Sequence, residues 1–311
     1  MDKIKDNMDL KWLFVSGKGG VGKTTLSSSI AIELSEYRDK VLLISLDPAH
    51  STSDIFKQKF CINPTLINGY NNLFCIEYNF SDIDKNINNS IINNKLLDIN
   101  LLIDIFNNIP GIDEAIGYIY LMNKILELEL EYSIIVFDTA PTALTLKLLY
   151  YPNLFQTSYD KLFNSSLSNI FKNLLTNILP INNNDSIENK FNIIKDKINN
   201  INNKLTKFNY TQFICVTTAD YLSIYEMERL IQKILLYDIE CNTIFINKLL
   251  ENVESKCNSC KNISIDQQYF LDILDELYSE DFNIIYIPLV EKQQKYEIIK
   301  KHLYNKVEYF N

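Results

Sequence analysis

The sequence predicts an α/β fold with a mainly parallel sheet flanked by helices, together with an inserted α-helical subdomain. Three observations lead to this prediction. Short apolar runs alternate with helical patterns along most of the chain. Four of the seven glycines fall in residues 17–22, directly after the first apolar run. Two long stretches interrupt the alternation and contain no clear strand.

Short apolar runs of the kind that form buried strands recur along the chain. Helical patterns lie between these runs, the first over residues 24–37. Strands that alternate with helices predict a parallel sheet covered on both faces. The predicted strands are residues 10–16, 41–46, 73–78, 133–137, 212–217, 243–246 and 283–287.

The two interrupting stretches are rich in Leu, Ile and Asn, and their apolar spacing is typical of amphipathic helices. Residues 181–204 are polar and of low complexity, so we expect part of this region to be disordered. The apolar stripes at 91–105 and 162–178 fit an ordinary core as well as a binding groove. We predict a main α/β domain of residues 1–80, 109–150 and 210–311, and a helical subdomain of 81–108 and 151–209.

Composition restricts the function and the compartment. The net charge of −9 argues against a general nucleic-acid-binding surface. Apolar runs fall far short of the ~20 residues that a membrane span needs, and the charged N-terminus does not resemble a signal peptide. Six cysteines without a secretory signal indicate a reducing compartment. We therefore expect a cytoplasmic protein.

The glycine cluster matches the phosphate-loop pattern G-x-x-x-x-G-K-[ST] between a strand and a helix, a context that disfavours a chance glycine-rich turn. Glycines let successive backbone N–H groups surround phosphate oxygens, and the following helix directs its positive end there. Lys23 is expected to reach the β- and γ-phosphates of ATP, and Thr24 to bind Mg²⁺. The predicted phosphate-binding residues are Gly17, Lys18, Gly19, Gly20, Val21, Gly22, Lys23, Thr24 and Thr25.

Lys18 is a second lysine early in the loop, a feature of the deviant P-loop ATPases. In that group this lysine reaches the nucleotide of a partner subunit, much as an arginine finger does. This interpretation makes ATP hydrolysis depend on dimerisation. The alternative is that Lys18 is an ordinary solvated lysine.

Two aspartates follow predicted strands and are expected at the same edge of the sheet. Asp138 is the usual kind of partner for Mg²⁺, held through water. Asp47 is placed to orient or deprotonate the attacking water. Alternatively, Asp47 only caps the helix that follows.

Cys257 and Cys260 form a CxxC pair, whereas a closed zinc site needs four ligands. Two subunits that each contribute one pair would complete a Cys₄ site. A redox pair and two inert thiols are the alternatives. Four other cysteines are expected in the core or in strands: Cys61, Cys75, Cys215 and Cys241.

Seven motifs in order resemble the eukaryotic cytosolic ATPases that target tail-anchored membrane proteins to the endoplasmic reticulum. This group is related to the bacterial arsenical pump-driving ATPases. The motifs are GKGGVGKTT (17–25), DPAHSTSD (47–54), PGIDEA (110–115), DTAPT (138–142), LSIYEMERL (222–230), CNSC (257–260) and QQYFLDILDELYS (267–279).

The resemblance implies a P-loop NTPase fold and an ATP-hydrolysing homodimer that carries Mg²⁺ and a shared Zn²⁺. It implies that Asp47 is the hydrolytic residue and that Asp220, Asn247 and Pro288 lie at the nucleotide. It further implies that the helical stretches bind the transmembrane helix of a client, which a receptor at the endoplasmic reticulum membrane then accepts. Ala143 and Leu144 depart from the Gly and His that the family has after Asp138.

Three other functions compete with targeting. An arsenite or antimonite pump motor would need two phosphate loops in one chain and a cysteine cluster, and the sequence contains neither. An ATP-independent holdase chaperone would use Cys257 and Cys260 as a redox pair. A partitioning ATPase would carry a DNA or membrane anchor, and residues 301–311 do not resemble one.

Overall fold

The computed structural model describes residues 4, 6–47, 51–78, 121–122, 124–140, 196, 199–250 and 257–289. The chain divides into two compact units. The first comprises residues 1–78, 131–146 and 206–311, and the second comprises residues 79–130 and 147–205. The described residues of the second unit are helical over most of their length.

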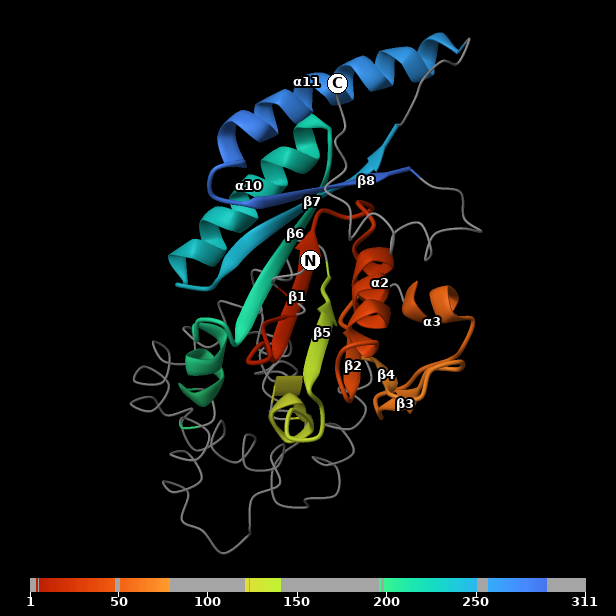
Figure 1. Cartoon of the computed structure of the whole chain (residues 1–311), viewed down its shortest axis with the longest axis vertical. Helices are drawn as coiled ribbons and strands as arrows, with labels where there is room; N and C mark the ends of the chain where they lie inside the picture. Colours follow the sequence, from red (N-terminus) through yellow and green to blue (C-terminus); the bar gives the residue numbers. More distant parts are fainter. Residues whose placement is uncertain are drawn as a thin grey trace, which may run out of the picture. The chain divides into compact units, whose positions relative to one another are not determined.

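The described residues of the first unit form an eight-stranded sheet with the order β3-β4-β2-β5-β1-β6-β7-β8 (Figure 1). Every pairing is parallel except that of β3 with β4. The strands are β1 (Trp12–Gly17), β2 (Val41–Ser45), β3 (Thr65–Leu66), β4 (Leu73–Glu77), β5 (Ile134–Asp138), β6 (Thr211–Thr218), β7 (Cys241–Leu249) and β8 (Asn283–Pro288).

Stacked aromatic rings join the central strands on one face of the sheet. The ring of Phe14 stacks on Phe137 at 4.2 Å and on Phe213 at 4.6 Å between centroids. Trp12, fully buried, meets Phe137 edge-on. Since these side chains come from β1, β5 and β6, they hold together the strands that carry the phosphate loop and Asp138.

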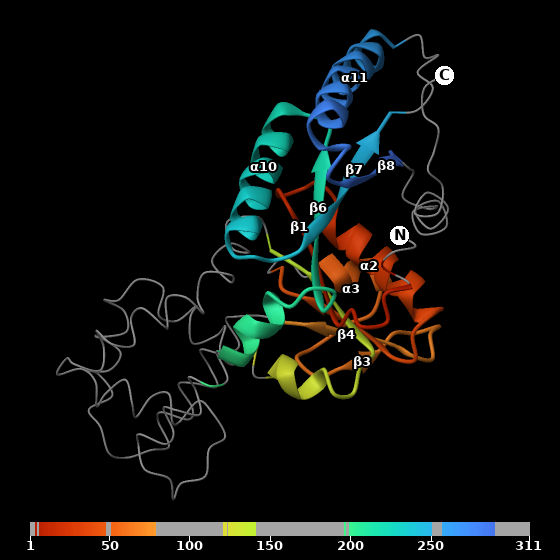
Figure 2. The same cartoon turned by 60° about the vertical axis from the view of Figure 1, so that its left-hand side comes forward.

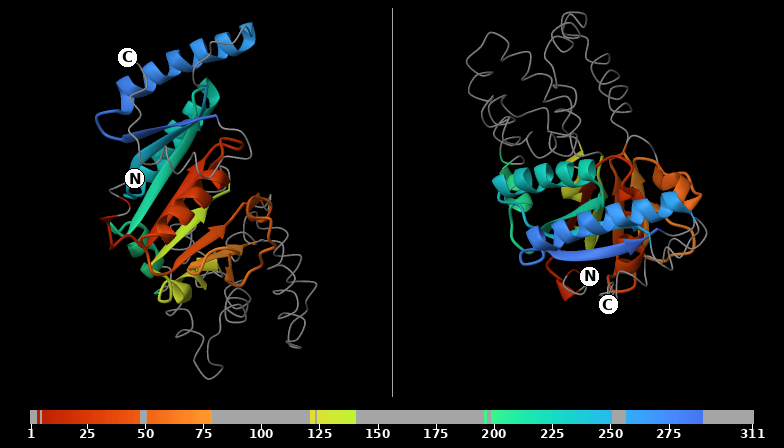
Figure 3. Two further views of the ribbon diagram at one scale, coloured as in Figure 1. Left: turned by 45° about the vertical axis from the view of Figure 1, so that its right-hand side comes forward. Right: turned by 90° about the horizontal axis from the view of Figure 1, so that it is seen from above.

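The described part of the first unit includes the helices α2 (Lys23–Ser35), α3 (Ser51–Phe56), α10 (Tyr221–Leu236) and α11 (Asn258–Tyr278), which Figure 1 labels. Helix α2 packs on β1, β2 and β5 through an apolar cluster that includes Leu26, Ile30 and Leu34. Helix α10 packs on β6 and its neighbours β1 and β7. Helices α10 and α11 lie side by side (Figures 2 and 3). None of the helices in the described part of the chain is long and apolar enough to cross a membrane.

The predicted α/β fold is confirmed, and each predicted strand lies on an observed one. The sequence missed β3, because its two residues are too few for a pattern. It also predicted only four residues of the nine-residue β7, since the strand continues into Asn247 and Lys248. Cys75, Cys215 and Cys241 are buried as expected, but Cys61 is exposed between α3 and β3, so that prediction was wrong.

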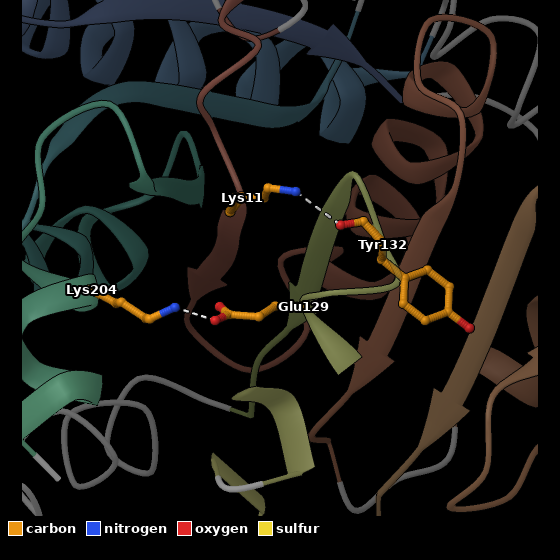
Figure 4. Close-up of polar contacts among 4 residues, drawn as sticks. All are labelled: Lys11, Glu129, Tyr132 and Lys204. Atoms are coloured by element: carbon orange, nitrogen blue, oxygen red, sulfur yellow. Dashed lines mark hydrogen bonds and ion pairs between the residues drawn. The ribbon is translucent and has the colours of Figure 1, made fainter. Parts of the chain in front are cut away.

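Figure 4 shows one polar contact from each unit. In the first unit, the Lys11 ammonium donates to the carbonyl oxygen of Tyr132 at 3.1 Å, which ties the start of β1 to the segment before β5. In the second unit, Lys204 forms an ion pair with Glu129, whose side chain is largely buried.

Candidate functional site: a phosphate loop at the carboxyl edge of the sheet

The loop between β1 and α2 uses glycines where other residues would not fit. Gly20 and Gly22 have φ angles of 82° and 101°, in the left-handed region that side chains disfavour. A Cβ atom on Gly17 would collide with the carbonyl of Val216 on β6, and one on Gly22 with the amide of Asn247. Gly22 precedes α2 without a side-chain cap, so a phosphate can accept hydrogen bonds from the first N–H groups of the helix.

Lys23 opens α2, and only 4% of its surface is exposed. Its ammonium donates to the carbonyl of Lys18 at 3.2 Å, across the loop. Burial lowers the pKa of Lys23, while the charges of Asp138, Asp47 and Glu226 oppose this shift. The side chain therefore lies inside the loop, where phosphate oxygens would replace the carbonyl of Lys18.

Asp138 ends β5 between the carboxyl ends of two other strands. It is in register with Val15 on β1 and with Ser45 on β2. The Ser45 hydroxyl donates to Oδ2 of the carboxylate at 3.4 Å. Burial raises the pKa of Asp138 to about 6, while hydrogen bonding from Thr24 and the charge of Lys23 oppose the shift.

These groups fit a magnesium ion. The buried Oδ1 atom of Asp138 accepts no well-formed hydrogen bond from the residues that the structure describes. The hydroxyl of Thr24 lies close enough to this carboxylate to lower its pKa. A hydroxyl and a carboxylate are oxygen ligands of the kind that Mg²⁺ prefers, and the ion would offset the cost of the buried charge.

Asp47 follows β2 at the same edge of the sheet and is partly buried. Its charge influences the pKa values of both Lys23 and Asp138. The fold thus brings together the three charged residues that the sequence assigned to phosphate, Mg²⁺ and water. Residues 48–50 lie outside the described part of the chain, as do Ala143 and Leu144 after Asp138.

Asp220 caps α10, because its Oδ1 atom accepts a hydrogen bond from the backbone N–H of Ser223 at 3.0 Å. Burial would raise the pKa of Asp220, but hydrogen bonds from Thr218 and Ser223 and the charge of Lys18 lower it overall. Lys18 therefore lies near an acidic group of its own chain. An aspartate directly before a helical pattern is a capping signal that the sequence contains.

Asn247 lies against the phosphate loop rather than pointing freely into solvent. Its Nδ2 atom donates to the carbonyl of Val21 at 2.8 Å, and its Oδ1 atom accepts from the backbone N–H of Lys248 at 2.9 Å. Each end of the amide retains one further hydrogen-bonding position. Pro288 ends β8, paired with Leu249 on β7.

Cys257 and Cys260 lie at the start of α11. Hydrogen bonds from the backbone and thiol of Cys260 and from the backbone of Ser259 lower the pKa of Cys257. A thiol that ionises readily suits zinc, but one chain supplies only two such ligands. Within the described residues there is no group of three or more His, Cys, Asp or Glu that could hold a metal.

The structure adds residues that the sequence did not single out. Ser45 contacts Asp138, Lys248 contacts the loop carbonyl of Gly20, and Gln267 contacts the end of β7. The strand-end position of Ser45 beside Asp47 was a usable signal. The other two contacts join residues distant in the sequence, so no local pattern could reveal them.

A glycine-rich loop between a parallel strand and a helix, with a buried lysine and an acidic strand end, defines a P-loop NTPase. Residues 10–302 match the anion-transporting ATPase family, and the chain belongs to it.

Similar proteins are also ATPases by name. The ATPase ASNA1 homolog of Plasmodium falciparum is 39% identical, and the match covers 98% of this chain and 82% of that protein. The ATPase GET3 of Mycosarcoma maydis is 38% identical, with coverages of 94% and 89%. That of Rhodotorula glutinis is 38% identical, with coverages of 94% and 86%. The resemblance seen in the motifs is confirmed, and the chain is an ATPase of this family.

Proposed function

We propose that this ATPase works as a cytosolic homodimer that binds the transmembrane segment of tail-anchored proteins and delivers them to the endoplasmic reticulum membrane. The observation that carries the proposal is the ordered set of targeting-ATPase motifs, within a chain that matches ATPases named GET3 and ASNA1 over nearly its whole length.

The hydrolytic step uses residues at the carboxyl edge of the sheet. Lys23 and the loop N–H groups bind the β- and γ-phosphates and stabilise the charge that develops as the bond to ADP breaks. Asp47 orients a water molecule toward the γ-phosphorus and accepts its proton. Mg²⁺ bound by Thr24, and by Asp138 through water, would neutralise charge on the phosphates.

Asn247 can perform two tasks at once. One hydrogen of its amide group is donated to the carbonyl oxygen of Val21. The other hydrogen and the second lone pair of the oxygen remain for the edge of an adenine base. Asp220 and Pro288 would border the nucleotide, since β6, β7 and β8 are adjacent, Asp220 follows the end of β6 by two residues and Pro288 ends β8.

Dimerisation would serve both catalysis and client binding. Lys18 would reach the nucleotide of the partner subunit, and Cys257 and Cys260 of each subunit would complete a shared Cys₄ zinc site. The proposed client-binding subdomain, residues 81–108 and 151–209, lies outside the described residues except for 196 and 199–209. Its apolar stripes would shield a helix of ~20 apolar residues from water.

Catalysis is tested with Asp47→Asn, which keeps the shape of the side chain and removes the base. ATP should still bind, whereas turnover should fall by about two or more orders of magnitude. Normal turnover would show that Asp47 is not the hydrolytic residue. Lys23→Ala is the control that should abolish nucleotide binding itself.

Client binding is tested by co-expression with a tail-anchored protein and purification of the complex. Ile91→Asp combined with Leu101→Asp should release the client, while Asn93→Asp combined with Asn94→Asp adds the same charge at polar positions and should retain it. Equal recovery of client with both variants would argue against this groove. Stimulation of ATPase activity by arsenite or antimonite would favour the pump function instead.

A further inference from the structure

The carboxyl end of β7 is irregular where it approaches the phosphate loop. The register of β7 against β8 shifts between Ile246 and Leu249. Lys248, inside this shift, has a φ angle of 64°, which is unfavourable for a residue with a side chain. Such a conformation persists where surrounding contacts stabilise it.

Gln267, in the middle of α11, supplies these contacts. Its Nε2 atom donates to the carbonyl of Lys248 at 3.1 Å, and its Oε1 atom accepts from the backbone N–H of Leu250 at 2.9 Å. One side-chain amide therefore bonds the main chain on both sides of Leu249. This arrangement fixes the irregular strand end to the helix.

The same strand end holds the phosphate loop at two neighbouring carbonyls. Asn247 donates to the carbonyl of Val21 at 2.8 Å. The ammonium of Lys248 donates to the carbonyl of Gly20 at 2.5 Å. A continuous series of hydrogen bonds thus runs from α11 through residues 247–248 to residues 20–21.

We infer that Gln267 is a positioning residue that sets the affinity of the phosphate loop for a nucleoside triphosphate from a distance. It acts through Asn247 and Lys248 and does not contact the phosphates itself. Nucleotide binding is thereby coupled to helix α11, and a displacement of this helix would loosen the loop. The inference rests on the proposed assignment of residues 17–25 as the phosphate-binding loop.

The test measures ATP affinity and turnover of the full chain carrying Gln267→Ala. Two hydrogen bonds are lost, so the dissociation constant of ATP should rise about 5- to 10-fold, while kcat at saturating ATP should stay within about twofold. The matched control is Gln268→Ala. Gln268 is the next residue on α11, donates to Asp272 of the same helix at 2.8 Å, and should leave ATP affinity unchanged when replaced.

A double-mutant cycle tests the route through the strand end. Lys248→Met should weaken ATP binding in the wild-type chain but add little in the Gln267→Ala background, because both changes interrupt one series of bonds. Additive losses, or unchanged ATP affinity in Gln267→Ala, would overturn the inference. If Gln267→Ala does not fold, Gln267→Glu, which keeps the acceptor for Leu250, replaces it. Lys23→Ala tests the loop assignment separately, since unchanged affinity there would refute the assignment rather than the coupling.

Discussion

Glu77 and Ser53 form a two-point contact between the end of β4 and helix α3. One carboxylate oxygen of Glu77 accepts from the backbone N–H of Ser53 at 2.7 Å, and the other accepts from its hydroxyl at 2.6 Å. The side chain of Glu77 is largely buried, which strengthens both bonds. Since α3 begins soon after Asp47 in the sequence, this contact fixes the helix that follows the proposed hydrolytic residue.

Removal of the Glu77 carboxylate should therefore affect both stability and turnover. Glu77→Ala should lower the free energy of unfolding by about 2 kcal/mol, the range for hydrogen bonds to a charged group. ATPase turnover should fall more than ATP affinity, because Lys23 and the phosphate loop remain in place. Urea unfolding and steady-state kinetics measure the two effects.

The control for this prediction is Ser53→Ala, which removes the hydroxyl and keeps the backbone N–H. Its loss of stability should be smaller than that of Glu77→Ala. If Glu77→Ala lowers ATP affinity and leaves kcat unchanged, the contact serves the phosphate loop and not the segment that follows β2.

Gly22 is predicted to tolerate no side chain, for two separable reasons. Its φ angle of 101° disfavours a side chain by about 1–2 kcal/mol, and a Cβ atom would also collide with Asn247. Gly69 has a φ of 90°, but a Cβ atom added there would have no neighbouring atom within 4 Å, so Gly69→Ala reproduces the backbone cost alone.

Both variants should lose stability, but only Gly22→Ala should weaken ATP binding, by about tenfold or more, as the loop moves away from Asn247. Calorimetric titration with ATP compares the two directly. Equal ATP affinities in Gly22→Ala and Gly69→Ala would mean that the collision is relieved without any movement of the loop.

The central strands and the loop could be predicted because their signals are local. The apolar runs of β1, β2 and β5 are continuous. Residues 17–24 carry a recognisable motif, and the geometry of the loop requires glycine at positions such as Gly17 and Gly22. The supports of the site could not be predicted in the same way. The contact of Gln267 with Lys248 depends on a register shift and on a positive φ at a lysine, neither of which has a sequence signature. Likewise, Glu77 only ends an apolar run, and its partner Ser53 lies in a separate helix.

Asp220 should stabilise α10 in a pH-dependent manner. Its pKa is lowered in the folded state, so the ionised cap contributes stability above the unfolded value of 3.8, and this contribution is lost as the pH falls through the lowered value. Asp220→Ala should cost about 1 kcal/mol at pH 7, as for other N-caps, and less near pH 3.

Asp220→Asn separates the cap from the charge, since its oxygen can still accept from the N–H of Ser223. Urea unfolding at both pH values should show a nearly constant stability difference between the Asn and Ala variants. The stability difference between the wild type and Asp220→Ala is expected to shrink from pH 7 to pH 3. If the difference between the Asn and Ala variants shrinks by the same amount, a group other than Asp220 titrates.

Ionisation of Asp138 is predicted to lower the free energy of unfolding of the nucleotide-free protein as the pH rises. Its pKa of about 6 in the folded state exceeds the usual 3.8, so between these values the folded chain binds a proton that the unfolded chain has released. With respect to this group, stability should therefore be highest below about pH 4, fall by about 3 kcal/mol between about pH 4 and pH 6, and change little above that.

Asp138→Asn lacks this titration. When Mg²⁺ and nucleotide are absent, its free energy of unfolding should therefore rise relative to that of the wild type between pH 4 and pH 7. Addition of Mg²⁺ and ATP at pH 7 should reverse the order, because the ionised carboxylate then has a cation to hold and the amide does not. Urea unfolding at pH 4, 5.5 and 7, with and without Mg²⁺ and ATP, provides the comparison. Parallel pH profiles of stability for the two proteins would refute the raised pKa of Asp138. Equal stabilisation of the two proteins by Mg²⁺ and ATP would show that Asp138 does not contribute to Mg²⁺ binding.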